Sequence, residues 1–293
     1  VYIYYGTTQT SPAQLRLERR DDSGVTFTNR GPLSNNVGGV DPGQFGYNVY
    51  LAASPTNADT VYIGSRDVFR STDAGTTFTD ISNSFAPPWP SGSYTPNSQK
   101  FHSDQQSFDF EPNNGNIFYC GNDGGIWKTT NGGTSFTSLN STLALTQFVG
   151  YGVHPTDATK SYGGAQDNGS QRRQTGTGWQ EFSGGDGGDL VINPLDPSMI
   201  FHSYVNGSIT RSVNNGGTYD GEIADDVTLL EPAGNARISF YPPIVGNKTN
   251  TKIYTGTWRL LRCENCEDRT KYLDQGGTPP TWVAPAGSFD QTR

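Results

Sequence analysis

The sequence predicts an all-β protein, a β-propeller of four-stranded antiparallel blades, of which six are recognisable. Three observations support this prediction: few helix-forming residues, a short segment that recurs along the chain, and strand-like runs that precede each copy in a constant order. The 293 residues include 37 Gly and 18 Pro and only 16% are charged, which excludes an α-helical bundle. Aromatic residues, 12% of the chain, supply buried surface that a disordered chain lacks.

The recurring segment is eight residues long and we call it the box segment. Its clearest copy is STDAGTTF at 71–78, and TTNGGTSF at 129–136 matches it position by position. A third copy lies at 212–219, a fourth at 22–27, and two eroded copies keep only the aromatic residues Trp179 and Trp282. Self-similarity at roughly 40 to 60 residues is typical of an array of one supersecondary unit.

The chemistry of the box segment predicts a turn between two strands. An Asp or Asn side chain accepts hydrogen bonds from nearby backbone N–H groups, and a Gly two residues later adopts a positive φ. The aromatic residue then begins the next strand and is expected to point inward. We interpret these residues as structural rather than catalytic: Asp22, Ser71, Asp73, Gly75, Phe78, Asn131, Gly133, Phe136, Asn214, Gly216 and Tyr219.

Three short strand-like runs precede each box segment, as at 49–53, 60–64 and 68–70. Each repeat therefore holds four antiparallel strands, which is the signature of a propeller blade. We expect one propeller domain over 1–293, with blades at about 1–31, 46–84, 101–142, 145–184, 188–222 and 236–287. The first blade begins at its second strand, so both a six-bladed ring closed by the tail and a part of a seven-bladed or larger protein remain open.

Charge and hydropathy limit the classes of partner and the cellular location that we expect for this chain. Twenty basic residues against 28 acidic ones give a net charge of -8, which repels a phosphate backbone and excludes nucleic acid as an expected partner. No apolar run approaches the ~20 residues of a membrane span. The polar surface with few lysines is typical of secreted β-proteins, so we expect an extracellular or cell-surface location, and the chain, which starts without Met, reads as processed or excerpted.

The box segments resemble the Asp-box or BNR repeat of sialidases, sortilin-type receptors and xyloglucan-active glycosidases. Four further stretches, HSDQQ at 102–106, GNDGG at 121–125, GGAQDNG at 163–169 and GGDGG at 184–188, look like segments of exported bacterial BNR/sortilin-like propeller proteins. The resemblance covers nearly the whole chain, and it implies a propeller fold and an extracellular setting.

Repeat geometry places one group of polar residues at the end of the blades opposite the box segments. The ligand-binding candidates there are His102, Asp104, Gln105, Asp123, Gln166, Asp167, Asn168 and Asp186. Calcium, the one cofactor considered, would bind carboxylates such as Asp123, Asp167 and Asp186. Asp104, Asp123, Asp167 and Asp186 are also the candidates for an acid–base pair in glycoside hydrolysis. The alternative, that these residues only cap their own loops, remains open.

Two functions follow from this arrangement. The first is an interaction or scaffold module that binds a glycan or an extracellular protein, and the alternative is a xyloglucanase-like glycoside hydrolase. Trp89, in the long irregular stretch 84–100, offers a flat ring for stacking a sugar or a peptide, or fills a junction between blades. Sialidase chemistry is disfavoured because it needs a cluster of three arginines, whereas the arginines here are scattered and several directly precede box segments.

The CxxC pair at Cys263 and Cys266 occupies the place where a box segment begins, since Cys263 follows Arg262 as Ser71 follows Arg70. A zinc site needs four ligands, and no second CxxC or nearby His is present. The sequence therefore predicts a disulfide that replaces the hydrogen-bonded turn.

Overall fold

The computed structural model describes residues 1–7, 14–21, 26–32, 46–82, 84, 101–143, 145–173, 176, 178–225, 238–257 and 259–286. Two of the predicted residues, Asp22 and Trp89, lie outside these ranges. The chain divides into two units, Val1–Ala144 and Leu145–Arg293, and each is described by itself.

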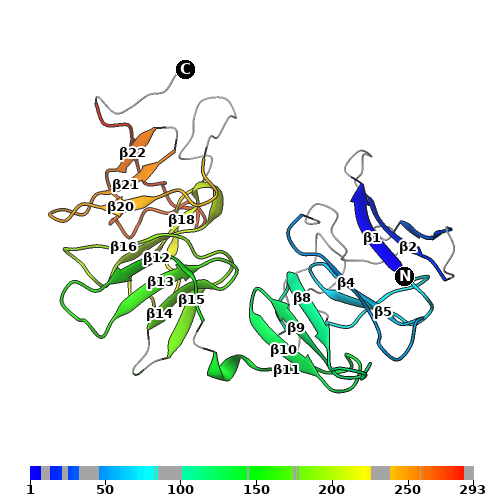
Figure 1. Cartoon of the computed structure of the whole chain (residues 1–293). Helices are drawn as coiled ribbons and strands as arrows, with labels where there is room; N and C mark the ends of the chain where they lie inside the picture. Colours follow the sequence, from blue (N-terminus) through cyan, green and yellow to red (C-terminus); the bar gives the residue numbers. More distant parts are fainter. Residues whose placement is uncertain are drawn as a thin grey trace. The chain divides into compact units, whose positions relative to one another are not determined.

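Unit 1 contains three antiparallel sheets in chain order (Figure 1). The first, as far as it is described, has three strands: β1 (Tyr2–Thr7), β2 (Gln14–Arg19) and β3 (Thr28–Pro32). The second has β4 (Tyr50–Ala53), β5 (Val61–Gly64), β6 (Val68–Ser71) and β7 (Thr79–Asp80). The third has β8 (Gln105–Phe110), β9 (Phe118–Asn122), β10 (Gly125–Thr129) and β11 (Thr137–Ser138), followed by the 3-10 helix η3 (Asn140–Thr142).

Unit 2 contains three four-stranded antiparallel sheets, stacked one on the next (Figure 1). The fourth sheet of the chain has β12 (Phe148–Val153), β13 (Ser161–Ala165), β14 (Gly169–Arg173) and β15 (Trp179–Ser183). The fifth has β16 (Leu190–Ile192), β17 (Ile200–Ser203), β18 (Ile209–Ser212) and β19 (Gly221–Ala224), with the 3-10 helix η4 (Val205–Gly207) before β18. The sixth has β20 (Ile244–Gly246), β21 (Ile253–Gly256), β22 (Leu260–Cys263) and β23 (Trp282–Val283).

The predicted fold class is confirmed: the described strands form six antiparallel sheets with the order of propeller blades. Within each unit the first strand of one sheet contacts the first strand of the next, as β4 contacts β8 and as β16 contacts both β12 and β20. In the other sheets the box segment follows the third strand, whereas in the first sheet, as far as it is described, it follows β2. The strands of the first sheet therefore correspond to the second, third and fourth strands of the other sheets.

The core lies between neighbouring sheets. In unit 1 the apolar side chains of the second and third sheets interleave, and the rings of Tyr62 and Phe118 lie with centroids 5.0 Å apart. In unit 2 the fifth and sixth sheets share a cluster that includes Phe201 and Ile253. Burial of each such side chain stabilises the fold by roughly 1.5 to 3 kcal/mol, so the contacts between sheets carry much of the hydrophobic stabilisation.

The box segment at 71–78 is a turn held by its own side chains. Ser71 Oγ accepts a hydrogen bond from the Gly75 N–H (2.8 Å), and Asp73 Oδ1 accepts one from the Thr77 N–H (2.8 Å). Thr77 Oγ1 donates to Asp73 Oδ2 (2.7 Å), and these bonds from Thr77 lower the pKa of Asp73 to about 2. Gly75 has φ 84°, and a Cβ there would lie 2.4 Å from Leu17 Cδ2 of the first sheet. The turn therefore needs glycine for its backbone and for its close approach to the neighbouring sheet.

The aromatic residue of the box segment follows the expectation in only part of the copies. Phe136 is buried, and Phe78 packs against the core of the first two sheets. Tyr219 is instead 41% exposed, and its hydroxyl donates a hydrogen bond to Asp274 (2.5 Å). The expectation that this residue points inward was wrong for Tyr219, because its polar hydroxyl finds its partner in a loop at the surface.

The side chain of Asp73 is expected to contribute to stability through the turn alone. Asp73→Ala removes the acceptor of the Thr76 and Thr77 N–H bonds, so the free energy of unfolding should fall by about 1 to 2 kcal/mol in urea denaturation. Asp73→Asn is the matched control, because Asn131 and Asn214 fill the same place in other sheets and accept the same backbone bond. An Asn variant as unstable as the Ala variant would contradict this account.

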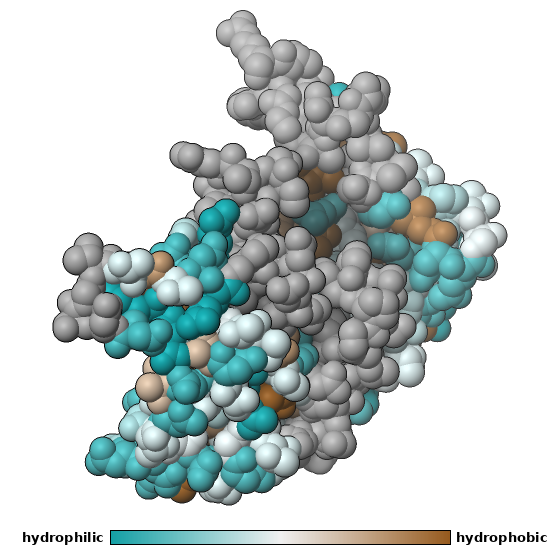
Figure 2. Space-filling view, turned by 90° about the vertical axis from the view of Figure 1, so that its right-hand side faces the viewer, coloured by the Kyte–Doolittle hydropathy of each residue, from teal (hydrophilic) through white to brown (hydrophobic). Residues whose placement is uncertain are grey.

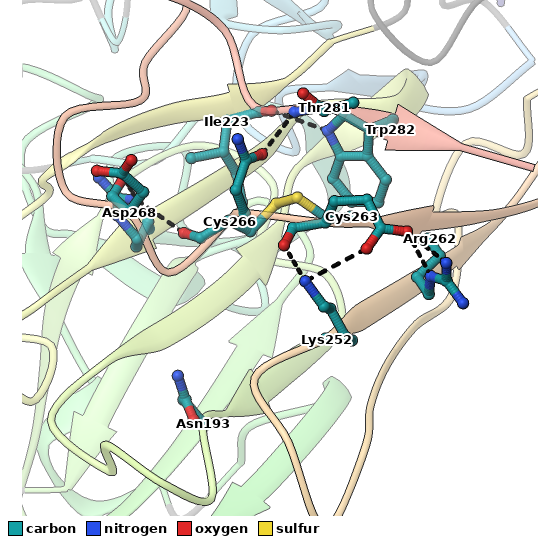
Figure 3. Close-up of a disulfide and its surroundings, with 12 residues drawn as sticks. Asn193, Ile223, Lys252, Arg262, Cys263, Cys266, Asp268, Thr281 and Trp282 are labelled. Carbon is teal, nitrogen blue, oxygen red and sulfur yellow. Dashed lines mark hydrogen bonds and ion pairs between the residues drawn. A yellow bond between two sulfur atoms is a disulfide. The ribbon is translucent and has the colours of Figure 1, made fainter.

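Cys263 and Cys266 form the predicted disulfide, in the turn that follows β22 (Figure 3). Both residues are buried. Around them the Trp282 indole N–H donates to the Ile223 carbonyl (3.1 Å), and the Thr281 N–H donates to Asn265 Oδ1 (2.7 Å). The disulfide thus takes over the part that side-chain hydrogen bonds play in the other box turns, while the bond from Trp282 to Ile223 joins the sixth sheet to the fifth.

The described surface that Figure 2 turns to the viewer is mainly hydrophilic, with small and separate hydrophobic patches. No helix among the described residues is both long enough and apolar enough to span a membrane.

Candidate functional site

The two ends of the sheets carry different residues. The box end holds the turns between the third and fourth strands. At the loop end the second strand turns into the third, and the chain passes from one sheet to the next. All the described ligand-binding candidates lie at the loop end of their unit, as the repeat geometry predicts.

In unit 1 the loop end brings two carboxylates together. Asp123, between β9 and β10, accepts hydrogen bonds from the Tyr47 hydroxyl (2.7 Å) and from Gln106 Nε2 (3.0 Å). Asp104, just before β8, accepts a hydrogen bond from the Asn48 amide. One oxygen of Asp104 lies within 4.8 Å of one oxygen of Asp123. This spacing allows the charge of one carboxylate to act on the other.

The pKa of Asp104 is raised above its ordinary value. Burial is the largest cause and the nearby Asp123 carboxylate is the second, while the hydrogen bonds from Ser103 and Asn48 act in the opposite direction. A carboxyl group in such a place holds its proton more readily than an exposed one. Asp104 is therefore suited to donate a proton, as a general acid does.

His102 and Gln105 build the loop that carries Asp104. Gln105 is fully buried, and its Nε2 donates to the carbonyls of Arg66 (3.1 Å) and His102 (2.8 Å). Asn122 also donates to the His102 carbonyl (3.0 Å). The side chain of Gln105 thus supports the loop and has no surface to offer a ligand, while His102 remains partly exposed.

In unit 2 the loop end carries a second group, the tyrosine–aspartate cluster of Asp167, Asp186, Tyr204 and Tyr241. Asp186 Oδ1 accepts hydrogen bonds from the Asp167 N–H (3.2 Å) and from the Tyr241 hydroxyl (3.3 Å). Asp167 lies between β13 and β14, and Asp186 follows β15, while Tyr204 follows β17 and Tyr241 precedes β20. Three successive sheets therefore contribute to one group of side chains.

The electrostatics of this cluster act on its tyrosines. Burial, followed by the charges of Asp186 and Asp167, raises the pKa of both Tyr204 and Tyr241. Both hydroxyls therefore stay protonated and able to donate hydrogen bonds far above neutral pH.

Glycines bring the tyrosine rings close to the backbone of the loop at 184–188. A Cβ on Gly185, which has φ 75°, would lie 2.7 Å from the Tyr204 ring. A Cβ on Gly188 would lie 3.1 Å from the Tyr241 ring. The rings thus pack closely against the loop backbone, while Tyr204 keeps 37% of its surface exposed.

Gln166 and Asn168 flank Asp167 and bond within their own loop. Asn168 Nδ2 donates to the Gln166 carbonyl (3.0 Å), and the Asn168 carbonyl accepts a bond from Gln171 Nε2 (2.9 Å). This is the loop-capping pattern expected of Asn in a turn. Calcium binding at Asp123, Asp167 and Asp186 stays a prediction.

Sequence reasoning missed Tyr47, Tyr204 and Tyr241. A signal was present, because stretches 203–208 and 238–243 occupy the same repeat positions as the acidic loops at 121–125 and 184–188.

No family model matches the chain. A xyloglucanase of Hypocrea jecorina (strain QM6a) is 29% identical over 122 residues, which is 41% of this chain and 13% of the relative. This chain thus spans 13% of the length of the curated relative that it matches.

Similar solved structures are more distant in sequence. The GH74 enzyme of Niastella koreensis is 16% identical with a TM-score of 0.36, over 96% of this chain and 44% of that one. The GH74 xyloglucanase from Xanthomonas campestris is 16% identical with a TM-score of 0.34, over 97% and 45%. YCF48 from Cyanidioschyzon merolae is 14% identical with a TM-score of 0.31, over 94% and 81%. All three TM-scores lie below 0.5, and the fold assignment rests on the sheets themselves.

Proposed function

We propose that this chain is a glycan-binding module of an extracellular protein, with the tyrosine–aspartate cluster of unit 2 as its ligand site. The observation that carries the proposal is the pair of tyrosine rings, Tyr204 and Tyr241, fixed beside the Asp186 carboxylate by a glycine-rich loop. This combination of flat apolar surface and oriented polar atoms is the usual make-up of a small-ligand site.

The chemistry of the cluster suits a sugar. A pyranose ring presents apolar C–H faces, which pack on an aromatic ring, and hydroxyls, which donate to a carboxylate. Phe240 adds a third ring, half exposed, with its centroid 4.8 Å from that of Tyr241 in an edge-to-face arrangement. The similarity to a xyloglucanase over 122 residues makes xyloglucan the first polysaccharide to test.

Removing either tyrosine ring is expected to weaken binding of xyloglucan oligosaccharides about five- to tenfold in isothermal titration calorimetry, because an aromatic contact contributes up to about 1.5 kcal/mol beyond area burial. The variants are Tyr204→Ala and Tyr241→Ala, and Tyr241→Phe separates the ring from its bond to Asp186. Tyr219→Ala is the matched control, since Tyr219 is similarly exposed but lies at the box end.

Two results would count against this proposal. The first is wild-type protein that binds neither xyloglucan nor any neutral β-glucan. The second is a loss of affinity in Tyr219→Ala as large as in the cluster variants. Melting temperatures measured in parallel show whether each variant is folded.

A second candidate function, glycoside hydrolysis, is favoured by Asp104 and Asp123 of unit 1. Asp104 has a raised pKa, and one of its oxygens lies within 4.8 Å of an oxygen of Asp123, so the two carboxyl groups are close enough to act as a pair on one glycosidic bond. The same titration samples, assayed for new reducing ends, decide between the two functions. A hydrolase releases reducing ends and loses that release in Asp104→Asn, whereas a binding module releases none.

A further inference from the structure

A pair of facing residues recurs on the second and third strands of every sheet, away from the loop end. An aromatic residue on the second strand stands opposite a cationic residue on the third. The pairs are Tyr2–Arg19, Tyr62–Arg70, Tyr119–Lys128, Tyr162–Arg172, Phe201–Arg211 and Tyr254–Arg262. All these cations lie toward the box end of their sheets.

Two of these arginines donate a hydrogen bond to the box-end turn of the neighbouring sheet. Arg70 Nη1 donates to the Gly132 carbonyl (2.7 Å), and Arg211 Nη1 donates to the Cys266 carbonyl (2.7 Å). Gly132 is the fourth residue of its box segment, and Cys266 is the fourth residue of the CxxC turn that replaces one. The bond is therefore a repeated feature that ties one sheet to the box turn of the next.

Arg172 departs from this pattern. The equivalent acceptor in the fifth sheet is the carbonyl of Asn215, the fourth residue of the box segment at 212–219. Arg172 bonds instead to Gln180 Oε1, through Nε (3.3 Å) and Nη2 (2.8 Å). A cavity of about 430 Å³ lies here, and both Arg172 and Asn215 line it.

The cavity has a concentrated positive charge. Lys160, Arg172 and Arg173 line it together with Thr159 and Tyr162. Lys160 pairs with Asp157 (3.3 Å), and Arg173 Nε donates to the Gly176 carbonyl (3.2 Å). Within the part of the chain that the structure describes, neither arginine pairs with a carboxylate. Two residues that line one cavity thus carry guanidinium groups without a carboxylate partner among the described residues, in a chain of net charge -8.

We propose that this cavity binds the carboxylate of an acidic sugar, a hexuronate unit. The planar guanidinium fork matches a carboxylate bidentately. The volume lies within the ~300 to 1,000 Å³ of sites for small organic ligands, which leaves room for a sugar ring beside the anion. Thr159 and Asn215 supply neutral hydrogen-bonding groups for its hydroxyls. The net negative charge of the chain repels a long polyanion and selects a ligand with few charges.

Calorimetric titration of the full chain with digalacturonate tests the proposal. The methyl ester of the same disaccharide is the neutral control ligand, and sodium sulfate is the probe for a bare anion. Digalacturonate is expected to bind about tenfold or more tightly than its ester, and Arg172→Gln and Arg173→Gln should each weaken it by about tenfold, because each removes charge-assisted hydrogen bonds. Its affinity should also fall with added salt.

Arg262→Gln is the matched control variant, because Arg262 holds the same register position in the sixth sheet but bonds to Glu264 (2.7 Å). It should change the affinity less than twofold. Equal binding of digalacturonate and its ester overturns the proposal, as does an Arg172→Gln variant that binds as wild type. Sulfate binding as tightly as digalacturonate overturns the assignment of a sugar. Tyr241→Ala, at the loop end, should leave this binding unchanged, which makes the test independent of the proposed function.

Discussion

Replacing Arg211 by Met is expected to lower the free energy of unfolding by about 3 to 5 kcal/mol, since it removes one partner of a buried ion pair and leaves the other uncompensated. Arg211 is fully buried, and its Nε bonds to Asp220 (2.8 Å). Its Nη1 donates to the carbonyls of Cys266 (2.7 Å) and Asp268 (2.8 Å), and its guanidinium lies 4.8 Å from the centroid of the Tyr272 ring. One side chain therefore satisfies acceptors from both the fifth and the sixth sheets.

Urea denaturation measures this loss, and Arg262→Met is the control. Arg262 occupies the same register position, but its side chain is 36% exposed and it pairs with Glu264 at the surface, so its loss should cost less than about 1 kcal/mol. The double variant Arg211→Met with Asp220→Asn should be more stable than the sum of the two single variants predicts, because each removes the unpaired charge left by the other. Similar losses for Arg211→Met and Arg262→Met would refute this account.

Mild acid is expected to destabilise the protein through His202. Burial lowers the pKa of His202 to about 3 in the folded chain, whereas the unfolded value is about 6.5. Above pH 6.5 the residue is neutral in both states and adds no pH dependence. Between the two pKa values the unfolded chain binds a proton that the folded chain does not, so stability falls by about 1.4 kcal/mol per pH unit as the pH is lowered, or by about 2 kcal/mol at pH 5.

The comparison of wild type with His202→Gln between pH 7 and pH 5 isolates this contribution. Asp73, whose pKa is lowered to about 2, loses its stabilising charge only in stronger acid. Asp104, whose pKa is raised, makes the folded state more stable as the pH falls, and it does so equally in wild type and in His202→Gln. Gln can bond to Ser170 and Thr210, the neighbours of His202, but it does not titrate. Stability curves that run parallel for the two proteins would assign the acid sensitivity elsewhere.

The features that could be predicted from the sequence join residues close together in the chain, whereas those that could not join residues far apart in it. The turn at Ser71 and Asp73 could be predicted because its hydrogen bonds close within eight residues, and turn chemistry is local. The disulfide between Cys263 and Cys266 could be predicted for the same reason.

The contact between Asp186 and Tyr241 could not be predicted in this way, because these residues meet only after the fourth, fifth and sixth sheets have stacked. The pairing of Arg211 with the Cys266 carbonyl depends equally on the packing of the fifth sheet on the sixth. The cation that precedes each box segment is visible in the sequence, but its acceptor belongs to the next repeat. The position of the loops and of their carboxylates followed from the repeat, whereas the tyrosines that meet Asp186 did not.

The box glycines Gly75 and Gly133 approach the preceding sheet closely, so the stability of their unit depends on contacts between successive sheets. Gly75 meets Leu17 of the first sheet, and Gly133 meets Ile81, which directly follows β7 of the second. Couplings of this kind give one-dimensional cooperativity, as in linear repeat proteins. Damage to one junction then divides a unit at that junction and leaves the remaining pair of sheets packed.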